Sequence, residues 1–154
     1  MAHEVTLIPG DGTGPELAEA TRRVLEATGV ALAWDVQEAG IDEYESSGNP
    51  FPPATPDSLK RTKVGIPWCS RRHTARRPST RGRTKMNPTA LMLSGVYLLA
   101  HPGEQDAAGR LESAIAEVIR RGEKVTYDLK ANRDDPTAVG TSQFADAVIE
   151  EMGS

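Results

Sequence analysis

The chain has 154 residues, 38% of them apolar and 26% charged, and its formal net charge is −4. This length and composition suit one globular domain, and the longest apolar stretch, 90–100, is too short to span a bilayer, so we expect no membrane contact. The single cysteine excludes an internal disulfide, and no basic region followed by an apolar stretch opens the chain. Both features lead us to expect a cytoplasmic protein.

The N-terminal part predicts a strand, a helix and a second strand. Residues 5–8 are apolar and β-prone, and a glycine-rich turn separates them from a helix expected over 15–28, with Thr13 or Gly14 as its cap. Apolar side chains alternate with smaller or polar ones over 32–36, which is typical of a half-buried strand. A strand–helix–strand opening favours an α/β fold.

Shorter elements are expected between Gly40 and the middle of the chain. This stretch is polar and rich in proline, which predicts a loop with one helical turn at 42–46. A short helix at 56–61 and a strand beginning at 63–66 should follow.

The C-terminal part predicts three helices and one short strand. Asn87 should cap a helix over 88–100, which is apolar nearly all round and therefore expected to lie centrally in the core. The other expected elements are a helix over 105–121, a strand at 125–127 and a last helix capped by Thr141 or Ser142. The helices over 15–28, 88–100 and 105–121 should cover the sheet.

A basic segment separates these two parts. Residues 67–85 hold seven of the 18 basic residues and no acidic one, which leaves 11 basic against 22 acidic residues elsewhere. The segment has no apolar period, so irregular structure is expected. We therefore divide the chain into 1–66, an irregular basic junction at 67–86, and 87–154. A nucleic-acid- or phosphate-binding protein that acts through 67–85 is the alternative function that this segment leaves open.

Three patterns suggest binding chemistry, and each has a plain structural explanation. The turn at 10–15 has glycines where a phosphate could approach a helix start, but its spacing departs from G-x-G-x-x-G, and a sharp turn explains it more simply. Cys69 and His73 lack the second ligand pair that a zinc site needs. Asp134 and Asp135 could bind a metal, but their polar loop suits a solvated turn better.

Separated segments carry a family resemblance. Residues 5–16 read Val-Thr-Leu-Ile-Pro-Gly-Asp-Gly-Thr-Gly-Pro-Glu, and residues 87–94 read Asn-Pro-Thr-Ala-Leu-Met-Leu-Ser. They resemble the isocitrate/isopropylmalate dehydrogenase family. The segments 125–128, 134–142 and 144–149 look most similar to its bacterial NAD-dependent isocitrate dehydrogenases. The resemblance covers about 4–66 and 86–152, and the central part of the family's sequence is missing between them.

The resemblance implies a fold and a few site residues. The fold is a reduced three-layer α/β large domain built from both ends of the chain, with the small domain absent. Two cofactor-binding positions carry over. Asn87 matches an asparagine that contacts the adenine of the dinucleotide, and Tyr127 lies where some relatives use a tyrosine near the cofactor ribose. No catalytic and no metal-binding residue carries over, because the family's missing middle supplies the acid and base, the substrate arginines and the metal-binding aspartates.

The resemblance also implies a reaction that this chain should not perform alone. Full-length relatives act in the tricarboxylic acid cycle and convert isocitrate to 2-oxoglutarate with NAD(P) and Mg²⁺ or Mn²⁺. Hydride transfer needs a base for the hydroxyl proton, and the metal stabilises the enolate left when carbon dioxide departs. We expect NAD or NADP to bind weakly if at all. The choice between NAD and NADP, and association with a second copy or a full-length subunit, stay open, and nucleic acid is the less favoured partner.

The genetic code offers an explanation for the basic segment. When the reading frame is shifted by one base, the codons that can encode residues 70–85 can also encode a loop that the family carries before Asn-Pro. This loop has the form Glu-Ala-x-His-Gly-Thr-Ala-Pro. For example, Ser70–Arg71 permits a glutamate codon and His73–Thr74 a histidine codon. We therefore expect an out-of-frame translation of the cofactor loop, with the frame restored near Lys85. The nucleotide sequence of the gene tests this hypothesis.

Overall fold

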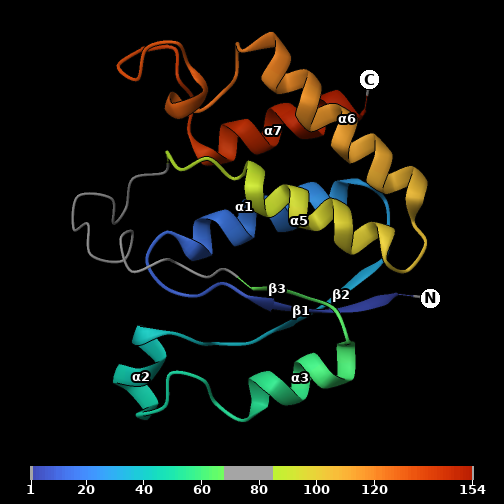
Figure 1. The fold of residues 1–154 in the computed structure, drawn as a ribbon, viewed down its shortest axis with the longest axis vertical. Helices are drawn as coiled ribbons and strands as arrows, with labels where there is room; N and C mark the ends of the chain where they lie inside the picture. The colour runs from blue at the N-terminus through green and yellow to red at the C-terminus, as the bar shows by residue number, and fades with distance from the viewer. Residues whose placement is uncertain (1, 68–84, 154) are drawn as a thin grey trace.

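A computed structural model describes residues 2–67 and 85–153, which form an α/β fold around a parallel sheet (Figure 1). The sheet order is β2-β1-β3, with β1 at His3–Ile8, β2 at Leu32–Val36 and β3 at Gly65–Pro67. Both neighbours run parallel to β1, and the helix that joins β1 to β2 makes the crossover that parallel pairing requires. The α/β class and the reduced sheet expected from the sequence are confirmed.

Helices cover both faces of this sheet (Figure 1). Helices α1, Gly14–Ala27, and α5, Thr89–Ala100, lie on one face, and α2, Ile41–Ser47, and α3, Ala54–Thr62, lie on the other side. This arrangement gives the three layers that the resemblance implies.

Two further helices extend the fold beyond α1 and α5. Helix α6, Gln105–Arg121, packs against α5 and α7, and α7, Thr141–Met152, packs against α1 and α6. The expectation that 105–121 covers the sheet is therefore wrong. Because α1 and α5 already occupy that face, the apolar stripe of α6 is buried against other helices.

One core joins the two parts of the chain. Leu17, Val24 and Leu25 from α1 and Leu111 and Phe144 from the C-terminal helices are all fully buried in it. The two parts approach each other closely at Gly95 in α5, where an added Cβ would lie 2.9 Å from a methyl carbon of Leu25. Residues before and after the basic segment therefore share a single hydrophobic interior.

The strand expected at 125–127 is wrong. The structure has a short 3₁₀ helix, η1, at Tyr127–Leu129, in which the N–H of Leu129 donates to the carbonyl of Thr126 over 3.0 Å. The Asp128 carboxylate accepts from the Thr126 hydroxyl at 2.7 Å and so stabilises the turn. Strand propensity alone does not make a strand, because a strand also needs a partner along its edge.

Burial differs from expectation at two other positions. Helix α5 is not central all round, because Tyr97 is 78% exposed on its outer side. Val36, expected on the buried side of its strand, is 51% exposed because β2 is an edge of the sheet and Val36 is its last residue.

Several helix and strand ends also differ from those expected. Pro88 is the cap of α5, which begins at Thr89, and α3 begins at Ala54, two residues earlier than expected. Gly140 is the cap of α7, and the expected cap residue Thr141 instead donates its hydroxyl to the carbonyl of Met86 at 2.7 Å. Within the described ranges, no helix has both the length and the apolar character needed to cross a membrane.

Candidate functional site

The site residues predicted from the sequence lie on segments that flank helix α5. Asn87 immediately precedes α5, and its half-buried side chain makes two hydrogen bonds. Its Oδ1 accepts from the backbone N–H of Thr89 at 2.9 Å, which stabilises the first turn of the helix. Its Nδ2 donates to Oδ2 of Asp128 at 2.9 Å. Pro88 holds the cap position predicted for Asn87, but the Asn87 side chain still satisfies a backbone N–H of the first turn, and the same amide connects α5 to η1.

Tyr127 lies one residue from this contact, at the start of η1. Its ring lies 5.9 Å from the guanidinium carbon of Arg133, within the range of a cation–π interaction. Tyr127 and Arg133 line a cavity of about 270 Å³, together with Lys85, Asp134 and Asp135. The structure therefore brings Asn87 and Tyr127 into one neighbourhood through Asp128. Tyr127 faces the cavity, whereas Asn87 is not among the residues that line it.

The paired aspartates 134 and 135 take part in turn geometry. Thr137 donates its hydroxyl and its backbone N–H to Oδ1 of Asp135, over 2.6 and 2.8 Å. The hydroxyl bond, followed by the backbone bond, lowers the pKa of Asp135 below its ordinary value of 3.8. The backbone N–H of Asp134 donates to the side chain of Asn132 at 3.1 Å. These contacts agree with the turn interpretation.

Residues 2–67 and 85–153 contain no group of three or more His, Cys, Asp or Glu side chains placed to hold one ion. Within these ranges, the residues do not fit the Mg²⁺ or Mn²⁺ that the resemblance implies for full-length relatives. Cys69 and His73, and with them most of the basic junction, lie outside the described residues.

The glycine-rich turn after β1 is held by its own aspartate. The Asp11 carboxylate accepts from the backbone N–H groups of Ile41 and Asp42, at 2.7 and 3.1 Å, and so satisfies the exposed start of α2. Gly40 makes this approach possible, because a Cβ there would lie 2.3 Å from an Asp11 oxygen. These contacts support the plain-turn interpretation, and the acidic Glu16 in the first turn of α1 disfavours a phosphate at that helix start.

Sequence reasoning missed three residues of the site. In the sequence, Asp128 belongs to a matched segment, Lys85 to the basic junction, and Arg133 to no pattern that indicates a site. The sequence does contain a signal for Asp128: it is an acidic residue next to Tyr127, and its carboxylate can accept a hydrogen bond from the side-chain amide of Asn87. No local pattern connects Lys85 with Arg133, because 47 positions of chain separate them and only the fold places both on one cavity.

Comparison with known proteins identifies the family. The model of the isocitrate/isopropylmalate dehydrogenases matches residues 4–70 and 74–148. An isocitrate dehydrogenase [NADP] of Thermus thermophilus is 44% identical over 61 residues, which cover 39% of this chain and 12% of that protein. The corresponding enzyme of Haloferax volcanii is 36% identical over 75 residues, which cover 49% of this chain and 18% of that protein. The matched segments thus span less than a fifth of these curated relatives.

Solved structures show the same fold at low sequence identity. A crystal structure titled as isocitrate dehydrogenase from Methylococcus capsulatus superposes with a TM-score of 0.87 and 18% identity, over 99% of this chain and 100% of that chain. The TT0538 protein of Thermus thermophilus superposes with a TM-score of 0.82 and 15% identity, over 98% of this chain and 68% of that chain. With matching segments on both sides of the basic junction, the chain belongs to the isocitrate/isopropylmalate dehydrogenase family.

Proposed function

We propose that this chain is a truncated isocitrate dehydrogenase of the NAD(P)-dependent decarboxylating type, which keeps a weak nucleotide site and does not oxidise isocitrate alone. The observation that carries the proposal is the cluster of Asn87, Tyr127 and Asp128 beside a cavity of about 270 Å³. It contains the two positions that match cofactor-binding residues of the family.

The chemistry of Asn87 suits an adenine base. A side-chain amide offers one donor and one acceptor in a plane, the pattern that adenine presents at N7 and its amino group. Both groups are already engaged, the oxygen by Thr89 and the nitrogen by Asp128. One N–H and one oxygen lone pair of the amide remain for an adenine, and exchanging water for adenine at these two sites leaves only a small net gain. For this reason we expect weak binding.

The cavity charge does not distinguish between NAD and NADP. Two cations, Lys85 and Arg133, and two carboxylates, Asp134 and Asp135, line the same space. Their formal charges cancel, so the additional phosphate of NADP gains no net attraction there. We expect similar affinities for the two dinucleotides. The two curated relatives are named for NADP, but the expected similar affinity of this chain for NAD and NADP follows from the cavity charge alone.

The proposed inactivity follows from the groups that the reaction requires. Oxidation of a 2-hydroxy acid needs a base at the hydroxyl, and the decarboxylation needs a divalent ion at the developing enolate. The residues that the family uses for both come from its central part, which this chain does not match. The carboxylates of the described residues do not converge on a point that could hold such an ion.

Association with a full-length subunit is the route by which such a chain could act. Ile41, Tyr44 and Phe51 are about half exposed and lie close together in sequence around α2. Exposed apolar side chains of this size would gain free energy if they were buried against another protein.

Nucleotide titration tests the proposal. Calorimetry and NMR with ADP-ribose, NAD and NADP should show weak, similar binding. The variant Asn87→Ser should lose most of it, because a serine hydroxyl can still accept from the backbone N–H of Thr89 but lacks the amide. Asn49→Ser is the matched control, since Asn49 Oδ1 accepts from the N–H of Phe51 at 3.0 Å in the same local geometry. Equal effects of the two variants would contradict the assignment of the site.

A separate assay tests the proposed inactivity. The purified chain, supplied with isocitrate, Mn²⁺ and either NAD or NADP, should produce no reduced nicotinamide. Sustained turnover would overturn this half of the proposal without affecting the nucleotide site.

A further inference from the structure

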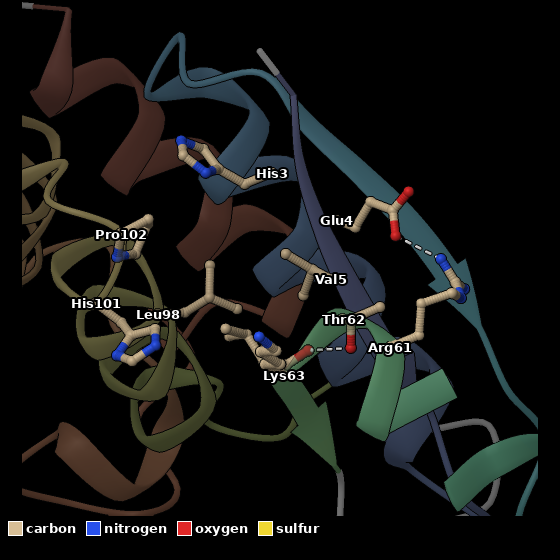
Figure 2. A pocket seen from close by; sticks show the side chains of 10 residues that line it. His3, Glu4, Val5, Arg61, Thr62, Lys63, Leu98, His101 and Pro102 are labelled. Atoms are coloured by element: carbon tan, nitrogen blue, oxygen red, sulfur yellow. Dashed lines mark hydrogen bonds and ion pairs between the residues drawn. The ribbon is translucent and has the colours of Figure 1, made fainter. Parts of the chain in front are cut away.

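A second cavity, of about 290 Å³, lies at the beginning of β1 (Figure 2). His3 and Val5 from β1, Lys63 from the end of α3, and Leu98, His101 and Pro102 from the end of α5 contribute to its lining. These residues come from three separate segments of the chain. Tyr127 and Asn87 are not among the residues that line it, and the family match assigns it no role.

The cavity has an apolar base. Val5 and Leu98 are almost fully buried, with exposed fractions of 1% and 5%, and Pro102 adds a ring beside them. Side chains alternate along a strand, so the Glu4 side chain points away from those of His3 and Val5 (Figure 2). Glu4 and Arg61 are nevertheless among the residues that line the cavity, and the Glu4 carboxylate forms an ion pair with Arg61. Arg61 thus balances the negative charge of Glu4, which leaves the charge of Lys63 uncompensated.

The rim carries basic side chains. Neither the Lys63 ammonium nor the His101 ring has a polar partner within the described part of the chain. The His3 ring is hydrogen-bonded to Glu104, with 3.1 Å between Nε2 and Oε1, and it lines one side of the cavity. An ammonium and an imidazole without partners, above an apolar base, make a surface that attracts an anion with an apolar portion.

The backbone at Lys63, a residue that lines the cavity, has a conformation that is unusual for a lysine. Lys63 is the one non-glycine residue with positive φ, 61°, among the residues that the structure describes. It ends α3 in the left-handed conformation, and its N–H donates to the carbonyl of Leu59 at 2.9 Å. Glycine is the usual residue at such a position, and a lysine there costs conformational energy. Strain of this kind is common where a side chain has a task.

We propose that this cavity binds a small organic monocarboxylate with a short apolar chain. The carboxylate accepts hydrogen bonds from the Lys63 ammonium and from an N–H of the His101 ring. The apolar chain lies on Val5, Leu98 and Pro102. This binding is independent of the proposed nucleotide site.

Butyrate is the probe. Sodium butyrate, added to the isotope-labelled full chain at concentrations on the order of 10 mM, should shift the methyl resonances of Leu98 and the ring resonances of His101 in NMR spectra. Sodium chloride at equal ionic strength corrects for screening. Butylamine, which has the same apolar chain with the opposite charge, should cause no shift, and inorganic phosphate, which has no apolar chain, should bind several-fold more weakly.

Two variants separate binding from folding. Lys63→Gly removes the ammonium and relieves the left-handed strain, so the chain should stay folded while the Kd for butyrate rises about tenfold. Lys60→Ala removes an equal charge three residues earlier, where the side chain pairs with Asp57, and should leave the Kd unchanged. Equal effects of the two variants, binding of phosphate as tight as that of butyrate, or no shift at Leu98 and His101 would each overturn the proposal.

Discussion

The shared core of the two chain parts predicts opposite effects for two glycine-to-alanine substitutions. Gly95 in α5 and Gly109 in α6 both lie inside helices, where alanine is favoured by about 1 kcal/mol. At Gly109 an added Cβ meets no atom within 4 Å, so Gly109→Ala should stabilise the chain by about that amount.

At Gly95 the same methyl group meets a packed side chain. It would lie 2.9, 3.1 and 3.2 Å from three carbon atoms of Leu25, which is fully buried. Overpacking of this kind costs about 1–3 kcal/mol, which equals or exceeds the helix-propensity gain. The unfolding free energies of the two variants should therefore differ by about 1–3 kcal/mol, with Gly95→Ala the less stable.

Urea unfolding followed by circular dichroism measures this difference. The dependence of free energy on urea should stay equal in both variants, so that the shift in midpoint reports stability alone. If both substitutions stabilise the chain equally, α1 and α5 are not in contact, and the residues before and after the basic junction do not share one core.

Three further predictions address other parts of the structure. Phe144→Ala should lower the unfolding free energy by about 3–5 kcal/mol because the ring is fully buried. Tyr97→Ala should change it by no more than about 0.5 kcal/mol because that side chain is 78% exposed. Similar losses for the two variants in urea titrations would place Phe144 outside the core. Hydrogen bonding from Arg120 lowers the pKa of Glu117 from 4.5 to about 2. This contribution is therefore complete above pH 4.5 and disappears as the pH falls toward 2, and Glu117→Gln should flatten the acid side of a stability–pH curve; an unchanged curve would argue against the pair. Asp11→Ala should raise the hydrogen-exchange rate of the Ile41 amide several-fold, because the Asp11 carboxylate accepts a hydrogen bond from this amide. Global stability should fall much less, because α2 buries no residue. An unchanged exchange rate would show that Asp11 does not stabilise the start of α2.

Local sequence signals determined most of the helices. The apolar period of 105–121 matches α6 to the residue, and Gly122 ends that helix in the left-handed conformation with φ 68°. Both signals act within a few residues, because each turn of a helix is bonded only to its own neighbours along the chain. The glycine turn after β1 was predictable for the same reason, since Gly10 and Gly12 have φ of 65° and 66°.

The motifs at both ends also determined the family and the α/β class without a structure. They did not determine how the elements are arranged. The expected strand at 125–127 does not form because Val125 and Thr126 have no strand edge beside them among the described residues. Residues 105–121 have the apolar stripe of a helix that covers a sheet, but this stripe packs against α5 and α7. Strand pairing and helix placement depend on partners far along the chain, which local propensity does not specify.

The sites show the same division. Sequence alone selected Asn87 and Tyr127 by their resemblance to family positions, but only the fold showed that Asp128 joins them and that Arg133 shares the cavity of Tyr127. His3 and His101 were isolated histidines in the sequence, and the tertiary structure places both on one cavity with Lys63. The residues that line a cavity come from segments that are far apart in the sequence. The sequence therefore specifies which side chains are available, and the packing of β1, α3 and α5 brings them together.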